Sequence, residues 1–370
     1  MRGRRFGLVA TYLVSLAILL ACSSSDAPTV ASEADPTTTT VPAPTTPTTA
    51  ATTTTTVPPR RGSGNPVTIA FAGDVNFEGT MRARLDADPA TALREVAPAF
   101  EAADLAMVNL ETAVTEGGSP ENKEFTFRAP PAALDALRAA GIDLASAANN
   151  HGRDFGAGGL QDSLAARAAS GFPLIGIGQD IDEAFTPFRA TVKGQRIAII
   201  AATQVLDDSL ISSWTAGPGI PGLASAKLVD RLVQEVQAAR VVSDTVVVFL
   251  HWGIEKQTCP TGSQQSLATT LVEAGADIVV GSHAHRLQGG GHMGQALVHY
   301  GLGNFAFYAG NAEGARTGIL LVTATGRDID GYQWLPGRVS DRVPHLLEGA
   351  EAEEALAYWD SLRDCTGLVP

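Results

Sequence analysis

Residues 245–251 read Thr-Val-Val-Val-Phe-Leu-His, an almost wholly apolar run that ends on a histidine. Such a run is typical of a strand in a sheet that is covered on both faces. Residues 277–285 read Asp-Ile-Val-Val-Gly-Ser-His-Ala-His and repeat the pattern, with two histidines after the apolar part. A helical pattern at 263–274 connects the two runs. This alternation of strand and helix predicts an α/β fold.

The alternation continues across most of residues 66–370. Further strands are expected at 67–72, 104–110, 142–148, 173–178, 188–192, 195–203, 296–302, 318–325 and 331–336. Further helices are expected at 81–103 with a break near Pro89, and at 131–140, 158–170, 226–242 and 351–363. The last strands follow one another without a helix, so the C-terminal section is expected to be antiparallel. The pattern favours one large folded body from residue 66 onward.

Polar side chains appear directly after six of the strand-like runs. The segments are Asp74-Val-Asn76, Asn109-Leu-Glu111, Asn149-Asn150-His151, His251 to Glu255, His283-Ala-His285 and Gly303-Asn304-Phe305. Four of the seven histidines of the chain lie in these segments. Because the carboxyl ends of the strands line the ligand crevice of an open α/β sheet, these residues can converge on one site. Aspartate, glutamate, asparagine and histidine are ligands for a divalent metal ion.

The histidines differ in how strongly their setting indicates metal binding. His283 and His285 are two residues apart in an expected extended segment, so both side chains should point to the same side. A lone histidine is more often structural, whereas a pair on one face after an apolar strand favours a metal ligand. His251 should emerge from a neighbouring strand end. The other histidines, His292, His299 and His345, fit ordinary structural roles.

Oxygen ligands and a candidate acid come from the same strand ends. Asp74 is a candidate ligand, with a turn-forming aspartate as the alternative. Glu111 ends a strand that is expected to be buried, where its carboxylate needs a metal or an arginine partner. Asn150 offers a neutral carbonyl oxygen, and His151 beside it is a candidate general acid. Asp154 could orient the His151 ring, or it could instead cap a helix start.

Arg128 is a candidate for binding an anionic group of a substrate. A guanidinium beside a site can hold a carboxylate or a phosphate through two parallel hydrogen bonds. The alternative is a surface arginine in the turn that precedes Pro130 and Pro131. We interpret Arg128 as the residue with the functional role.

The first residues are typical of an export signal. Arg2, Arg4 and Arg5 precede an apolar run at 6–21 that is short for a membrane span. The run ends in Leu-Leu-Ala-Cys at 19–22 and resembles the lipobox of bacterial lipoproteins. This resemblance implies cleavage before Cys22 and lipid on its sulfur, so that the protein is anchored at the extracellular face of the cell membrane. An ordinary signal peptide or an uncleaved anchor is the alternative.

Residues 22–65 consist mostly of threonine, proline, serine and alanine and are expected to form a disordered tether. The two cysteines beyond the tether, Cys259 and Cys365, can form a disulfide outside the cytosol, but their spacing leaves this open. The formal net charge of −13 argues against nucleic acid as a partner, because proteins that bind nucleic acid need a basic face.

The ordered set of motifs resembles the CapA family of capsule or poly-γ-glutamate synthesis proteins, which is related to the calcineurin-like metallophosphoesterases. The matching motifs are Gly73-Asp74, Asn109 to Thr112, Phe127 to Pro131, Ala148 to His151, His251-Trp252-Gly253, Gly281 to His285 and Gly303 to Phe305. The resemblance implies a four-layer αββα sandwich of the metallophosphatase type with mixed sheets. It also implies work on an anionic envelope polymer of the poly-γ-glutamate type, or within its synthesis complex.

The resemblance also assigns residues to a metal centre of one or two ions of manganese, zinc or iron. The implied metal ligands are Asp74, Glu111, Asn150, His251, His283 and His285, with His151 and Arg128 as catalytic candidates and Asp154 and Asn304 beside them. Asn76 stands where the related phosphoesterases have a metal-binding histidine, which implies weaker ligands for one ion.

Three functions are compatible with these features. The first is a metal-dependent hydrolase or transferase that acts on an amide or ester of an envelope polymer. The second is a non-catalytic lipoprotein that binds the polymer and assists its assembly or export. The third is a true phosphoesterase.

Overall fold

A computed structural model describes residues 60–370, which form two main β-sheets and the helices around them. The larger sheet has the strand order β18-β17-β16-β1-β2-β5-β6, with β15 beside β1. These strands are β1 (Val67–Val75), β2 (Leu105–Leu110), β5 (Leu144–Ser146), β6 (Leu174–Ile175), β15 (Asn304–Ala306), β16 (Arg316–Thr325), β17 (Asp328–Ser340) and β18 (Val343–Leu346). The predicted signal peptide, Cys22 and the tether up to residue 59 lie outside the described residues.

The second sheet has the order β13-β14-β12-β11-β9-β8. Its strands are β8 (Phe188–Val192), β9 (Gln195–Thr203), β11 (Thr245–His251), β12 (Ile278–Ser282), β13 (Leu287–Met293) and β14 (Ala296–Leu302). Two short pairs complete the strands: β3 (Ala113–Val114) with β4 (Arg128–Ala129), and β7 (Ile177–Gly178) with β10 (Gly222–Leu223). Each main sheet contains both parallel and antiparallel pairs, as predicted.

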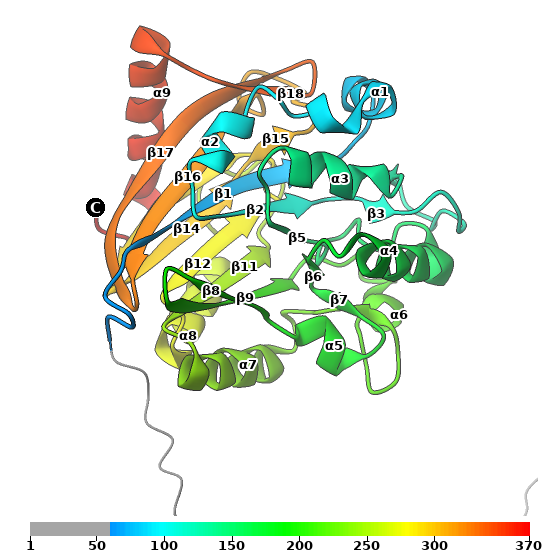
Figure 1. Cartoon of the computed structure of the whole chain (residues 1–370), viewed down its shortest axis with the longest axis horizontal. Helices are drawn as coiled ribbons and strands as arrows, with labels where there is room; N and C mark the ends of the chain where they lie inside the picture. Colours follow the sequence, from blue (N-terminus) through cyan, green and yellow to red (C-terminus); the bar gives the residue numbers. More distant parts are fainter. Residues whose placement is uncertain (1–59) are drawn as a thin grey trace, which may run out of the picture. The chain divides into compact units, whose positions relative to one another are not determined.

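The helices cover the outer faces of the two sheets (Figure 1). One group packs on the larger sheet: α1 (Thr80–Ala87), α2 (Ala97–Glu101), α3 (Ala132–Ala139) and α4 (Gly156–Ser170). The other group packs on the second sheet: α5 (Ile181–Phe185), α7 (Val229–Val242) and α8 (Gly262–Ala274). Helix α6 (Ile211–Trp214) lies in the connection from β9 to β10, and α9 (Gly349–Ser361) lies beside β17. Among the described residues no helix combines the length and apolar character needed to span a membrane.

Three apolar layers separate these elements. Along β1, Ile69 and Phe71 face the second sheet, whereas Ala70 and Ala72 face helices α1 to α4. Along β11, Val247 and Phe249 lie between the sheets while their neighbours contact α7 and α8. This alternation follows from the two-residue period of a strand. It gives the four-layer αββα sandwich that was predicted, with apolar runs because both faces of each sheet are covered.

One strand of the second sheet was missed because its sequence is rich in glycine. Strand β13 reads Leu-Gln-Gly-Gly-Gly-His-Met, which is typical of a loop. A Cβ atom on Gly289 would lie 2.4 Å from the Leu362 oxygen, and one on Gly291 would lie 2.5 Å from the Val369 oxygen. The C-terminal segment therefore packs directly on the backbone of β13. The strand has glycine where close approach requires it.

Two long-range contacts fix the ends of the described chain. Cys259 and Cys365 form a disulfide with their Cα atoms 5.7 Å apart, which joins the loop after β11 to the segment after α9. At the other end, the Arg61 guanidinium donates to Asp328 at 2.8 Å, and Arg60 contacts the same carboxylate. Within the described residues, Arg60 and Arg61 already contact the folded body, although the sequence assigns them to the tether.

Candidate metal centre

The candidate site lies where strands of both sheets end. Asp74 near the end of β1 is in register with Asn109 of β2 and with Asn304 of β15. His251 ends β11 and is in register with Ser282, the last residue of β12. Glu111 directly follows β2. The side chains that the sequence places at strand ends therefore meet at one edge, as expected.

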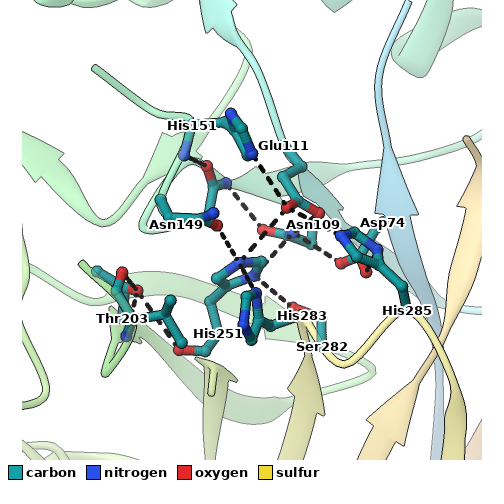
Figure 2. A network of polar contacts seen from close by, with 12 residues as sticks. Asp74, Asn109, Glu111, Asn149, His151, Thr203, His251, Ser282, His283 and His285 are labelled. Carbon is teal, nitrogen blue, oxygen red and sulfur yellow. Dashed lines mark hydrogen bonds and ion pairs between the residues drawn. The ribbon is translucent and has the colours of Figure 1, made fainter. Parts of the chain in front are cut away.

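Glu111 lies at the centre of the cluster (Figure 2). Its Oε1 atom lies 3.6 Å from Nε2 of His251, 3.7 Å from Nε2 of His285 and 3.9 Å from Nε2 of His151. The carboxylate is fully buried, and Oε1 accepts no hydrogen bond from the described residues. Burial and the nearby charge of Asp74 raise the pKa of Glu111 well above its usual value. In its ionised form, a carboxylate buried in this way needs a positive partner.

Among residues 60–370, two groups of side chains could each hold a metal ion, and Glu111 belongs to both. The first group is Glu111, His251 and His283, and the second is Asp74, Glu111 and His285. Within each group the ligand atoms lie within 4.8 Å of one another. Asp74 Oδ2, like Glu111 Oε1, is buried and accepts no hydrogen bond from the described residues. Carboxylate and imidazole ligands whose buried oxygens accept no hydrogen bond from the described residues fit one or two divalent ions.

The environment of His251 keeps its ring neutral. Burial and the neighbouring His283 and His285 hold the pKa of His251 well below its usual value. Its Nε2 atom lies 2.7 Å from Oδ1 of Asn150 and 3.1 Å from Nδ1 of His283. On the other side of the ring, Nδ1 lies 3.1 Å from the Ser282 hydroxyl. The predicted ligands Asn150, His251 and His283 thus meet at one point, and a neutral imidazole is the form that binds metal.

His283 and His285 serve different groups, contrary to the expectation for an extended pair. Their φ angles are +92° and +49°, so both follow the end of β12 in a tight turn rather than in a strand. The turn sends His283 toward His251 and His285 toward Asp74 (Figure 2). Left-handed backbone at non-glycine residues costs about 1–3 kcal/mol and is concentrated at functional sites. The turn with positive φ angles therefore places His283 in the first group and His285 in the second.

The second group is oriented by Asn304. His285 Nδ1 lies 2.8 Å from Oδ1 of Asn304 and 3.1 Å from Oδ2 of Asp74. The Asn304 amide donates to the Gly314 carbonyl oxygen at 2.9 Å, which fixes its orientation. With Nδ1 occupied, Nε2 of His285 faces Glu111. Asn304 therefore lies beside the candidate ligands, where the sequence places it.

His151 is held by Asp154. The Asp154 Oδ2 atom lies 2.5 Å from Nδ1 of His151 and also accepts the Phe127 backbone N–H at 2.7 Å. Helix α4 has Phe155 as its N-cap, and no capping hydrogen bond from a side chain is present there among the described residues. The alternative role of Asp154 as a helix cap is therefore absent, and the carboxylate orients the imidazole. Burial lowers the pKa of His151, although Asp154 opposes this effect.

Two further residues considered from the sequence make no side-chain hydrogen bond to this network within the described residues. The Arg128 side chain is exposed on β4, with its guanidinium 4.9 Å from the centre of the Phe155 ring. Its role as an anion clamp stays a prediction. Asn76 is fully buried, and neither its amide oxygen nor its amide nitrogen has a hydrogen-bond partner among the described residues.

The structure adds residues to which the sequence gave no role. Asn109 donates to Asp74 Oδ1 at 2.9 Å and accepts from Asn149 at 3.0 Å, so the two amides link the strand ends. Both lie in the strand-end segments, and this position is the feature of the sequence that could have indicated their role. Lys123 contacts Asp154 at 2.7 Å from a connection with no periodic pattern. Nothing in the sequence pointed to this lysine.

A cavity of about 610 Å³ opens beside the centre. Polar, charged and aromatic side chains line it: Asn122, Lys123, Glu124, Phe125, Asn150, His151, Asp207, Ser209, Glu255, Lys256 and Tyr308. Because Asn150 and His151 form part of its wall, a molecule in the cavity would reach the candidate metal ligands. The large apolar side chains of Phe125 and Tyr308 are partly exposed at its edge.

Comparison with known proteins gives one family and several relatives. The sequence matches bacterial capsule synthesis protein PGA_cap over residues 68–309. It is 31% identical over 225 residues to capsule biosynthesis protein CapA of Bacillus anthracis, which covers 59% of this chain and 54% of that protein. It is 28% identical over 252 residues to PGA biosynthesis protein CapA of Bacillus subtilis, which covers 67% of this chain and 65% of that protein.

These matches span between about half and two thirds of the relatives' own lengths. Among solved structures, a phosphatase from Mycoplasma pneumoniae aligns with a TM-score of 0.43 at 11% identity. The alignment covers 78% of this chain and 97% of that one.

Proposed function

The chain belongs to the PGA_cap family of bacterial capsule synthesis proteins, and from this premise we propose that it is a metal-dependent hydrolase or transferase in capsule synthesis. Its substrate in this proposal is an anionic envelope polymer with amide or ester links, of the poly-γ-glutamate type. The names of its relatives, capsule biosynthesis and PGA biosynthesis proteins, support this substrate class. Lipid on Cys22 would hold the protein at the extracellular face of the cell membrane.

The observation that carries the proposal is the position of Glu111. One buried carboxylate belongs to two separate groups of candidate ligands, and each group adds at least one histidine of its own. A structural core gains little from such an arrangement, because an unpaired buried acid is costly. Two ions that share a carboxylate would satisfy it, and the family resemblance implies the same centre.

The chain's own residues can then perform the proton transfer. When bound, a divalent ion supplies Lewis-acid polarisation of a carbonyl or phosphoryl oxygen. His151 lies outside both ligand groups, and Asp154 holds its Nδ1 atom, so Nε2 is left for the substrate. Asp154 also stabilises the imidazolium that forms when Nε2 takes up a proton. In amide cleavage this proton would come from the attacking water or hydroxyl group, whose oxygen bonds to the carbonyl carbon, and it would pass to the leaving nitrogen as the C–N bond breaks.

The experiment that tests the proposal combines metal analysis with a survey of substrates. The purified full chain is loaded with manganese or zinc and assayed on poly-γ-glutamate, on a chromogenic γ-glutamyl anilide and on a phosphate monoester. We expect stoichiometric metal and turnover of the amide, and we expect His283→Ala to lose both. The matched control is His345→Ala, which removes an exposed histidine on β18.

The other outcomes identify the competing functions. A metal-free protein that still binds poly-γ-glutamate without cleaving it would contradict the enzymatic proposal and favour an assembly role. Turnover confined to the phosphate monoester would contradict the polymer as substrate and favour a phosphoesterase.

A further inference from the structure

Lys123 is a buried lysine that lies between the cavity and the candidate centre. Its side chain is 7% exposed, and Nζ lies 2.7 Å from Oδ1 of Asp154, which is itself fully buried. The same ammonium donates to the backbone carbonyl oxygen of Asn150. Trp214 closes another side, with its ring centre 4.9 Å from Nζ. A lysine is rarely buried unless it is paired, so this position is specified by its partners.

The two acceptors of Lys123 belong to residues with roles in the site. Asp154 orients His151 through its second oxygen, and Asn150 presents its amide oxygen to His251. Lys123 therefore contacts both the acid's orienting group and the backbone of a candidate ligand. No other lysine of the described chain hydrogen-bonds to either residue.

Two hydrogen bonds leave one N–H of the ammonium for the cavity. Lys123 is one of the residues that line this cavity. The next acid, Asp207, lies 3.7 Å away through Oδ2, beyond hydrogen-bond distance, and is half-exposed. An ammonium at a cavity wall is a point charge that binds carboxylate or phosphate oxygens. The third N–H therefore has no hydrogen-bond acceptor among the described residues, and Lys123 lies at the wall of a space that a substrate can enter.

We propose that Lys123 is a positioning residue that holds Asp154 and Asn150 in place and binds an anionic oxygen of the substrate with its remaining N–H. This inference rests on the proposed function for the identity of the reaction. Its structural half, the fixing of His151 through Asp154, is independent of any substrate. The two halves can therefore be tested separately.

The structural half is tested by nuclear magnetic resonance of the zinc-loaded or metal-free full chain labelled at histidine. The His151 Hδ1 proton, assigned with His151→Gln, should give a downfield signal because it is hydrogen-bonded to Asp154. We expect Lys123→Met to broaden or remove this signal. The matched control is Lys193→Met, since Lys193 also lies 2.7 Å from an aspartate oxygen, that of Asp104, outside the site. An unchanged His151 signal in folded Lys123→Met would overturn the proposal, whether or not the wild type turns over any substrate.

The substrate half is tested by chemical rescue. In Lys123→Ala we expect kcat/KM for a γ-linked glutamate oligomer to fall about 100-fold. A misplacement of reacting groups by about 1 Å lowers a rate by a similar factor. Added ethylammonium should restore part of this loss, because it can enter the vacated space from the cavity. Inhibition of the wild type by inorganic phosphate and by glutarate is then compared. Stronger inhibition by glutarate identifies a carboxylate as the anion that Lys123 binds, and stronger inhibition by phosphate identifies a phosphate. Absence of rescue in a folded Lys123→Ala protein, or kcat/KM within twofold of wild type, would contradict the proposed contact.

Discussion

The Nε2 atom of His251 lies 3.6 Å from Oε1 of Glu111, although the two residues follow strands of different sheets. Glu111 follows β2 of the larger sheet, and His251 ends β11 of the second. The contact therefore exists only when both sheets are stacked in their native arrangement. The candidate centre lies at the junction of the sheets, so the fold itself brings its ligands together.

Replacement of Glu111 by glutamine tests the shared carboxylate. The amide keeps the size of the side chain but removes the charge that both groups need, so we expect both ions to bind weakly. Without metal the variant should be at least as stable as the wild type, because a neutral group replaces an unpaired buried acid. A metal at 100 times its Kd stabilises a protein by about 2.7 kcal/mol, and this gain should largely disappear.

The measurement is thermal unfolding with and without added manganese or zinc, together with metal content by mass spectrometry. Glu348→Gln, an exposed residue before α9, serves as the matched control. An undiminished metal-dependent rise in Tm for Glu111→Gln would show that Glu111 is not a ligand.

Replacement of His151 by glutamine should separate proton transfer from metal binding. His151 is absent from both ligand groups, so the metal content should stay at the wild-type value. Loss of a positioned acid typically lowers kcat by about 10²–10⁴-fold. Single-turnover kinetics on metal-loaded protein checks this expectation, with His345→Gln as the control. A variant that loses its metal along with its activity would instead place His151 among the ligands.

Much of the fold was predictable because its signals are local. The run at 245–250 became β11 (Thr245–His251), and the expected break near Pro89 separates α1 from α2. Apolar strands with a two-residue period and helices between them leave few alternatives to an α/β sandwich. Strand β13 was not predicted, because its glycines are required by close packing against the backbone of the C-terminal segment. That segment is distant in sequence, so no local pattern indicates the contact.

The candidate site was predictable to the extent that it lies at strand ends. Asp74, Glu111 and His251 were found because a polar residue directly after a buried strand is unusual. The separation of His283 from His285 was not predictable, since it depends on a turn with positive φ angles. Lys123 was missed because a loop carries no periodicity, and its contact with Asp154 spans 31 positions.

Removal of the disulfide should destabilise the chain and leave the strand framework intact. The bond joins residues 106 positions apart, and native disulfides that close long loops contribute about 2–5 kcal/mol. We expect the double variant Cys259→Ser/Cys365→Ser to lose stability of this order in urea denaturation. A reducing agent should lower the stability of the wild type but not that of the double variant. Equal stability of both proteins without reductant would show that the bond is absent or without effect.

His299, which belongs to neither group of candidate ligands, should make the free energy of unfolding depend on pH. It is fully buried between Trp334 and Trp359, and burial lowers its pKa to about 3. The unfolded chain, with a histidine pKa near 6.5, binds one more proton between these values, so stability falls as the pH drops below about 6.5. Between pH 7 and pH 5, this residue should lower the free energy of unfolding by about 2 kcal/mol.

The measurement is the unfolding free energy of the wild type and of His299→Gln at both pH values. The variant should lose less stability between pH 7 and pH 5, by about 2 kcal/mol, because glutamine does not titrate. His345→Gln, with an exposed histidine, should behave as the wild type. Parallel pH profiles for wild type and His299→Gln would contradict a neutral buried ring.

The central claim is that two groups of ligands sharing Glu111 hold metal. Anomalous diffraction from crystals of the protein grown with manganese or zinc, recorded on both sides of the metal's absorption edge, tests it most directly. The account predicts anomalous density adjoining the Glu111 carboxylate, between His251 and His283 on one side, between Asp74 and His285 on the other, or at both places. Metal-supplemented crystals with no anomalous density among these side chains would contradict it.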